Sequence, residues 1–86
     1  MNLQQTSLDA WNNLQLGIGQ RQMQVYLAIK DMREATNAML SKRLQLPINC
    51  ITPRTLELRH LGMVVESYRD KCPITGRSAI FWKVGA

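Results

Sequence analysis

Two short amphipathic segments, separated by a proline and ended by a glycine, constrain this chain more than any other feature. They lie within residues 35–65, and the first covers residues 36–44 with Thr36 as a candidate N-cap. Pro47 ends it, because the residue before a proline is disfavoured in the α region and the ring suits the start of another helix. Helices this short are marginal alone, so both must pack on other parts of the chain.

The second segment, residues 48–61, is apolar on one side and mostly polar on the other. At about 100° per residue, Thr55, Leu58 and Leu61 fall on the same side as Ile51. We therefore expect this side to face a core. The side expected to face outward consists of Asn49, Pro53, Leu56 and His60.

The start of the second helix has two solutions because of Pro53. If the helix begins at Ile48, Pro53 follows its first turn and removes one backbone hydrogen bond. If Thr52 is the N-cap, Pro53 occupies the favoured first helical position. We expect an irregular first turn over residues 48–51, followed by a regular helix over residues 52–61.

Beyond Gly62, a residue that can end a helix with positive φ, the hydrophobic period changes from helical to strand-like. The pattern predicts a β-hairpin that pairs residues 63–69 with residues 78–84 across an eight-residue loop, residues 70–77. Alternation along the second strand predicts one core face. That face consists of Ile80, Trp82 and Val84.

Two further helices are predicted before these elements. The first is short, covers residues 7–15 and contains Trp11; the second covers residues 20–33 and would support the two later helices. Trp11 is a candidate anchor for a homodimer contact, although packing onto the chain's own core is the favoured alternative. The inward face of the longer helix consists of Val25, Ala28, Ile29 and Met32.

The length of 86 residues indicates one domain over residues 1–86, with its core in about residues 20–84. Two cysteines without a C-x-x-C spacing and a single histidine predict neither a disulfide framework nor a metal site. No stretch has the pattern of a signal peptide or a membrane span, so the expected location is the cytoplasm. No catalytic triad, carboxylate pair or phosphate-binding glycine loop is found, and we expect neither an enzyme nor a cofactor.

The net charge of +5 is unevenly placed along the chain. Residues 1–41 carry three basic and three acidic residues, whereas residues 42–86 carry eight basic and three acidic ones. The whole excess therefore belongs to the two short helices and the hairpin. A polyanion is the partner that this asymmetry favours, because each neutralised phosphate releases counterions. Surplus basic residues that only aid solubility are the alternative.

Helix, turn, helix, glycine and a hairpin with a basic loop, in that order, resemble a winged helix-turn-helix domain over about residues 20–84. More narrowly, INCITPRTLELRHLG followed by KCPITGRSAIFWKV resembles small bacterial and phage winged-helix proteins that carry T-P-R and C-P-x-T-G-R patterns. Thr55 departs from this pattern, since the relatives usually carry an aliphatic residue there. The resemblance implies an α+β fold class, mainly α with a small β-hairpin.

The same resemblance implies a DNA-binding surface, because helix-turn-helix domains lay the N-terminal part of the second helix against base edges. Asn49 suits adenine, and Arg54 suits guanine or a phosphate. Thr52 has a helix cap as its alternative role, and Lys42 and Arg43 could instead complement a helix C-terminus. The candidate residues are Asn49, Thr52, Arg54, Leu56 and Arg59 on the second helix, Arg69, Lys71 and Arg77 on the hairpin, and Lys42 and Arg43 on the first helix.

Two function classes follow from these features. The first is sequence-specific binding of double-stranded DNA by a regulator of transcription or replication of bacterial or phage type. The second is a winged-helix module for protein–protein interaction, in which the apolar residues Leu56 and Trp11 would matter more than the basic ones. Salt dependence separates the two, because phosphate contacts weaken steeply with salt and apolar contacts do not.

Overall fold

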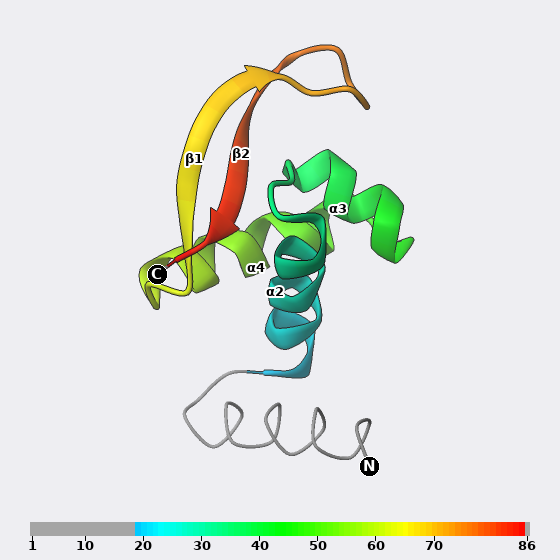
Figure 1. Cartoon of the computed structure of the whole chain (residues 1–86). Coiled ribbons are helices and arrows are strands. Elements are labelled where there is room, and N and C mark those ends of the chain that lie inside the picture. The colour runs from blue at the N-terminus through cyan, green and yellow to red at the C-terminus, as the bar shows by residue number, and fades with distance from the viewer. Residues whose placement is uncertain (1–18, 86) are drawn as a thin grey trace.

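The computed structural model describes residues 19–85, which form three helices followed by a two-stranded antiparallel sheet (Figure 1). The predicted leading helix over residues 7–15, with Trp11, lies outside the described residues. The order of the described elements is the one expected from the sequence. They are α2 (Gln20–Met32), α3 (Asn37–Leu44), α4 (Ile48–His60), β1 (Val64–Lys71) and β2 (Ser78–Val84).

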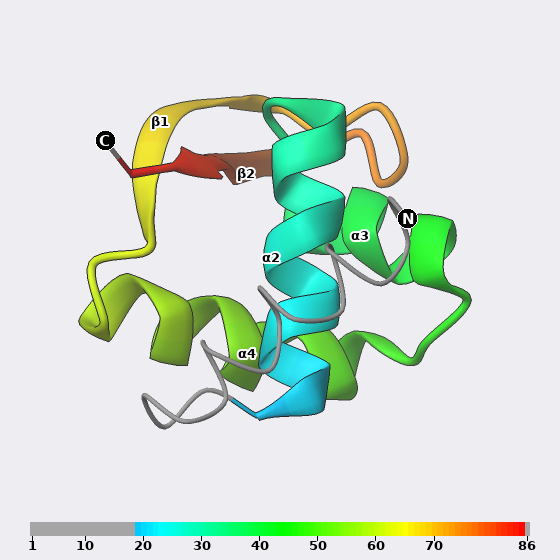
Figure 2. The ribbon, with the colours of Figure 1, turned by 60° about the horizontal axis from the view of Figure 1, so that its bottom comes forward.

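The three helices share one core with the hairpin, and α2 lies across α4 (Figure 2). The predicted inward face of α2 is confirmed, since Val25, Ala28 and Ile29 are buried and Met32 is partly buried. Met23 is buried as well, which the sequence interpretation missed. The remaining fully buried side chains of the core include Leu40 of α3, Ile51 and Leu58 of α4, and Val64 of β1.

The turn between α3 and α4 follows from local residues. Thr36 caps α3, because its Oγ1 accepts a hydrogen bond from the backbone N–H of Met39 at 3.1 Å. Gln45 ends the helix in the left-handed conformation with φ of 55°. Pro47 then precedes the first residue of α4. The predicted N-cap and the predicted connection are both confirmed.

The start of α4 corrects the sequence prediction. The helix is regular from Ile48, so the expected irregular first turn over residues 48–51 is wrong. Thr52 is not a cap, and its hydroxyl donates to the Ile48 carbonyl at 3.2 Å within the helix. Pro53 therefore lies inside α4, where it leaves the Asn49 carbonyl without its helical donor. Because Asn49 is exposed, water can take the place of that donor.

The two sides of α4 match the prediction except at its end. Ile51, Thr55 and Leu58 are buried, as expected. Leu61 was expected to face inward, but 52% of it is exposed, because it is the C-cap residue where the regular helix has already ended. Gly62 follows with φ of 78°, which confirms its predicted role in ending the helix.

The hairpin is longer than predicted. β1 reaches Lys71, which pairs with Ser78, so that the connecting loop is residues 72–77. A bulge at Ser67 interrupts the register between Glu66 and Tyr68. The chain between α2 and α3 also joins this sheet, because the backbones of Ala35 and Trp82 exchange two hydrogen bonds of 3.0 and 2.8 Å. This bridge fixes the hairpin against the helices.

The predicted core face of β2 is confirmed. Trp82 is buried, and Ile80 and Val84 pack against the same core. Phe81 is also buried, although alternation places it on the opposite face of the strand. The ring of Tyr68 covers it there, stacked with centroids 4.7 Å apart.

Candidate nucleic-acid interface

The outward side of α4 is made mainly of uncharged residues. Asn49 and Thr52 are exposed near the N-terminus of the helix, and Leu56 follows with 48% of its surface exposed. The Thr52 hydroxyl donates to a carbonyl of its own helix, which leaves its oxygen free to accept a hydrogen bond. The structure thus brings together three of the predicted residues on one short surface.

Arg54 is turned back toward the helical core instead of outward. Its guanidinium forms an ion pair with Glu57, in which Nη2 donates to Oε2 at 3.1 Å, and Nε lies 2.8 Å from Oε1 without the alignment of a hydrogen bond. Gln22 of α2 donates to the same carboxylate at 2.7 Å. Arg54 therefore helps to fix α4 against α2, and the structure does not bring it into line with Asn49 and Thr52.

The hydrogen bond from Gln22 is the main reason why the pKa of the Glu57 carboxyl is lowered. Partial burial opposes this effect, and the charge of Arg54 adds to it. The Glu57 carboxylate thus stays ionised and keeps its contacts with Gln22 and Arg54. The i, i+3 spacing of Arg54 and Glu57 was a readable signal in the sequence, whereas the contact with Gln22 depends on helix packing.

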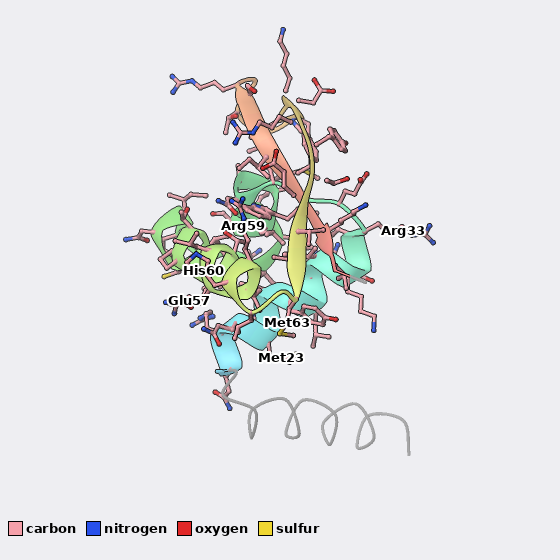
Figure 3. The ribbon with its side chains drawn as sticks, turned by 90° about the vertical axis from the view of Figure 1, so that its left-hand side faces the viewer. Met23, Arg33, Glu57, Arg59, His60 and Met63 are labelled. Carbon is pink, nitrogen blue, oxygen red and sulfur yellow. The ribbon has the colours of Figure 1, made fainter. Side chains whose placement is uncertain are left out.

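Arg59 lies between α4 and the hairpin (Figure 3). Its guanidinium carbon is 5.7 Å from the ring centroid of Trp82, within the range of a cation–π contact. The side chain remains exposed to solvent. Arg59 therefore supports the hairpin from α4 while it keeps a positive charge at the junction of the two elements.

The predicted basic residues of the hairpin differ in whether they form an ion pair. Arg69 pairs with Glu66 of the same strand at 3.3 Å. Lys71 and Arg77 are exposed at the two ends of the loop, and neither side chain forms an ion pair with another residue of the 19–85 range. These two cations are the ones best placed to meet an anion.

Lys42 and Arg43 lie next to the hairpin loop in space. Together with Pro73 and Ile74 they line a concavity of about 370 Å³, and the loop passes above α3 in the ribbon (Figures 1 and 2). Both residues are exposed, but Arg43 pairs with Asp31 of α2, whereas Lys42 forms no ion pair with another residue of the described range. Lys42 therefore joins the cations of the loop on one side of the molecule, and Arg43 serves mainly to connect α3 with α2.

Cys72 anchors the loop to Thr36, the N-cap of α3, a contact that the sequence interpretation missed. The Thr36 hydroxyl accepts from Met39, so its own proton is free to donate to the buried Cys72 sulfur at 3.0 Å. Burial alone would raise the pKa of this thiol, but hydrogen bonds from Thr36, from the backbone of Thr75 and Ile74, and from the Thr75 side chain lower it. The loop is therefore held at its base by a buried polar contact.

The described residues 19–85 contain no cluster of three or more histidine, cysteine, aspartate or glutamate side chains that could hold a metal ion. Within the same range, no helix has both the length and the apolar character needed to cross a membrane. The candidate residues lie on α4, the hairpin and the end of α3.

This arrangement defines a winged helix-turn-helix domain, in which α3 and α4 form the helix-turn-helix and the hairpin of β1 and β2 forms the wing. Among solved structures the chain is similar to the reduced form of MarR from E. coli, with a TM-score of 0.63 and 25% identity over 80% of this chain. The match covers 48% of the MarR chain, so this chain spans about half its length.

The chain is also similar to reduced HlyU from Vibrio cholerae, with a TM-score of 0.64 and 20% identity over 99% of this chain and 81% of that one. At this identity the likeness concerns the fold. Comparisons with protein-family models and with curated proteins found no match.

Proposed function

We propose that the protein binds double-stranded DNA sequence-specifically and regulates transcription. The observation that carries this proposal is the placement of charge, since the whole excess of +5 belongs to residues 42–86, which contain α4 and the wing. Such an excess on one part of a small domain attracts a polyanion. The winged-helix fold supports the same class of partner, because it presents a helix of suitable size to the major groove.

Transcription is favoured over replication because MarR and HlyU, which share the fold, are winged-helix transcription regulators. Such a role would be carried out in the cytoplasm, next to the DNA. The narrower sequence likeness to proteins of bacterial or phage type adds no further detail about the regulated process.

The residues divide into two roles in this proposal. Asn49 pairs with adenine in the major groove, Thr52 contacts a phosphate oxygen or a thymine methyl group, and Leu56 contacts a thymine methyl group. Lys71, Arg77 and Lys42 contact phosphates and position the domain. Because Arg54 and Arg59 are engaged within the protein, we assign them to the support of α4 and of the wing. Arg69 and Arg43 each form an ion pair within the protein, so we assign them a secondary role in DNA binding.

Selection of bound duplexes from a random pool tests the proposal directly. We expect a consensus to emerge, and we expect affinity for it to fall steeply between about 50 and about 200 mM salt. A pool that remains random after selection would contradict sequence-specific binding. Affinity that barely changes with salt would contradict phosphate contacts.

An interaction module for another protein is the second candidate, and the exposure of Leu56 on the outward side of α4 favours it. An apolar contact centred on this residue would bury it against a partner. Leu56→Ala should then abolish partner binding, whereas DNA binding should lose only a fraction of its affinity. A salt-insensitive complex that depends on Leu56 would make this candidate the better one.

Homodimer formation remains a prediction that the same selection can test. Dimeric helix-turn-helix proteins bind two half-sites related by two-fold symmetry, about one helical turn apart. A selected consensus with this symmetry would support a dimer on DNA. A single asymmetric site, together with a monomer mass in sedimentation, would contradict it.

A further inference from the structure

A hydrogen bond from a buried hydroxyl joins the two helices of the helix-turn-helix. Thr55 of α4 is only 1% exposed, and its hydroxyl donates to Oδ1 of Asn37, the first residue of α3, at 2.9 Å. The same hydroxyl lies 3.1 Å from the carbonyl of Thr52 in its own helix. A threonine hydroxyl has one proton, so these two acceptors share it.

The first turns of α4, which carry Asn49 and Thr52, have one backbone hydrogen bond fewer than a regular helix. Pro53 has no N–H, so the Asn49 carbonyl lacks its helical donor. On one side of this gap the Thr52 hydroxyl donates to the Ile48 carbonyl at 3.2 Å, and on the other side the Thr55 hydroxyl approaches the Thr52 carbonyl. Thr55 therefore connects this part of α4 to a residue of α3.

Asn37 directly follows two residues that are tied to the wing. The backbones of Ala35 and Trp82 exchange two hydrogen bonds, and the hydroxyl of Thr36 is hydrogen-bonded to the Cys72 sulfur at 3.0 Å. The next residue, Asn37, accepts the hydrogen bond from α4. These three consecutive residues therefore join the wing to α4.

The buried residues of α4 are Ile51, Thr55 and Leu58, and Thr55 is the polar one. Apolar packing is non-directional and leaves the rotation of a helix loosely fixed, whereas a hydrogen bond restricts both distance and angle. Groups that recognise a ligand must be held within about 0.5 Å and about 10–20° of their productive geometry. A small rotation of α4 would thus move the Asn49 amide away from the edge of a base.

We propose that Asn37 and Thr55 are positioning residues for base recognition. Their hydrogen bond sets the rotation of α4 relative to α3 and the wing, and it thereby sets the place where the Asn49 amide meets a base. Neither Asn37 nor Thr55 needs to touch DNA for this role. The inference rests on the proposed function, in which Asn49 reads adenine.

Two substitutions of Thr55 separate positioning from stability. Thr55→Val keeps the shape of the side chain and removes the hydroxyl, whereas Thr55→Ser keeps the hydroxyl and leaves a methyl-sized gap in the core. Thr55→Val should lower the preference for the selected site over a site with one mismatched base pair about tenfold, and Thr55→Ser should keep it within about twofold of the parent. The salt slope should stay the same in both, because no charge is removed.

The two variants should rank in the opposite order in thermal unfolding, since the serine variant has the poorer packing. A merely structural role for Thr55 would make the preference follow this stability order. A valine variant that is as selective as the parent, or a serine variant that is the less selective of the two, would overturn the proposal.

A double-mutant cycle tests whether the two residues act through one hydrogen bond. Asn37→Ala removes the acceptor at a half-buried position, and it should lower the preference to the same extent as Thr55→Val. The double variant should be no worse than either single variant, because each change breaks the same contact. Ser67→Ala removes a hydroxyl hydrogen bond to Glu34 at the bulge of β1, and this control should keep the preference. Losses that multiply to about a hundredfold in the double variant would show that Asn37 and Thr55 act independently.

Residual dipolar couplings of backbone N–H groups measure the orientation of α4 relative to α2 in the absence of DNA. The parent and Thr55→Ser should share one orientation, and Thr55→Val should differ from it. Couplings that are the same in all three proteins would overturn the positioning role, even where the parent binds DNA sequence-specifically. If the couplings differ as expected but the parent selects no consensus, the proposed function fails while the hydrogen bond is still shown to orient α4.

Discussion

The outward side of α4 and the loop of the wing differ in how their charges are held. On α4, Arg54 pairs with Glu57 and Arg59 lies over Trp82, so both cations already have a partner within the protein. On the wing, Lys71 and Arg77 form no ion pair with other residues of the described part of the chain. On this domain α4 presents uncharged groups that form directional hydrogen bonds. The cations that can meet a phosphate lie on the wing.

This difference has a physical consequence for DNA binding. A free cation on a long side chain neutralises phosphate on any sequence, whereas an amide such as Asn49 discriminates between bases. We therefore expect the wing to supply affinity and α4 to supply preference. This division of roles would be wrong in any of three cases. The helix α4 could present another face, Asn49 could fail to discriminate between base pairs, or the arginines of α4 could be free of their contacts within the protein.

The largest expected effect tests the orientation of α4. Leu58→Ala should lower the free energy of unfolding by about 2–5 kcal/mol, because Leu58 is fully buried in the core. Leu56→Ala, on the exposed side of the same helix, should cost about 0.5 kcal/mol or less. Urea denaturation measures both. Equal losses for the two variants would mean that the two sides of α4 have been assigned wrongly.

A smaller effect tests base discrimination. Asn49→Ala should remove about 1–3 kcal/mol of the preference for the selected site over a site with one mismatched base pair. His60→Ala, exposed at the other end of α4, is the matched control and should leave the preference unchanged. Competition titrations with the two duplexes give the numbers. A preference that survives in Asn49→Ala would move base reading to other residues.

The smallest effect tests whether Arg54 of α4 is held by its ion pair with Glu57. The pKa of Glu57 is lowered in the folded state from its ordinary value of 4.5. A lowered carboxyl pKa stabilises the fold above the unfolded pKa, and this stability is lost as pH falls through the folded pKa. Glu57→Gln should thus be less stable than the parent at about pH 7 and should approach it below about pH 4.5, as thermal unfolding would show. A pH-independent difference between the two proteins would contradict the Gln22–Glu57–Arg54 contact.

The order and type of the elements could be predicted because their signals are local. Pro47 and Gly62 end or begin elements whatever the rest of the chain does, and Thr36 caps α3 through its own neighbours. The alternation along β2 likewise predicted the burial of Trp82. Such features need only a few adjacent residues to be recognised.

The start of α4 could not be predicted, because two local preferences compete there and packing decides between them. Thr52 suits an N-cap and Pro53 suits the first turn, but burial of Ile51 in the core is satisfied by a helix that already begins at Ile48. The cost is one missing hydrogen bond at the carbonyl of Asn49, an exposed residue, where water can take the place of the donor.

The exposure of several candidate residues could be predicted from the sequence, but the contacts that hold the other candidates could not. Sequence alone could not show that Arg43 reaches Asp31, or that Cys72 meets Thr36, because these contacts join elements that only the tertiary fold brings together. The exposed residues Asn49, Thr52, Lys71 and Arg77 needed no partner, so their placement was the easier part.

The most direct measurement of the central claim is the salt dependence of DNA affinity for charge-matched variants. Lys71→Gln/Arg77→Gln removes two charges from the wing, and Lys30→Gln/Arg33→Gln removes two from α2 and the residue after it, where Arg33 points away from α4 (Figure 3). The account predicts that the wing variant binds all duplexes more weakly and that the slope of log affinity against log salt falls by about one for each lost phosphate contact. The α2 variant should keep a slope close to that of the parent. Identical slopes for the parent and the wing variant would contradict the account.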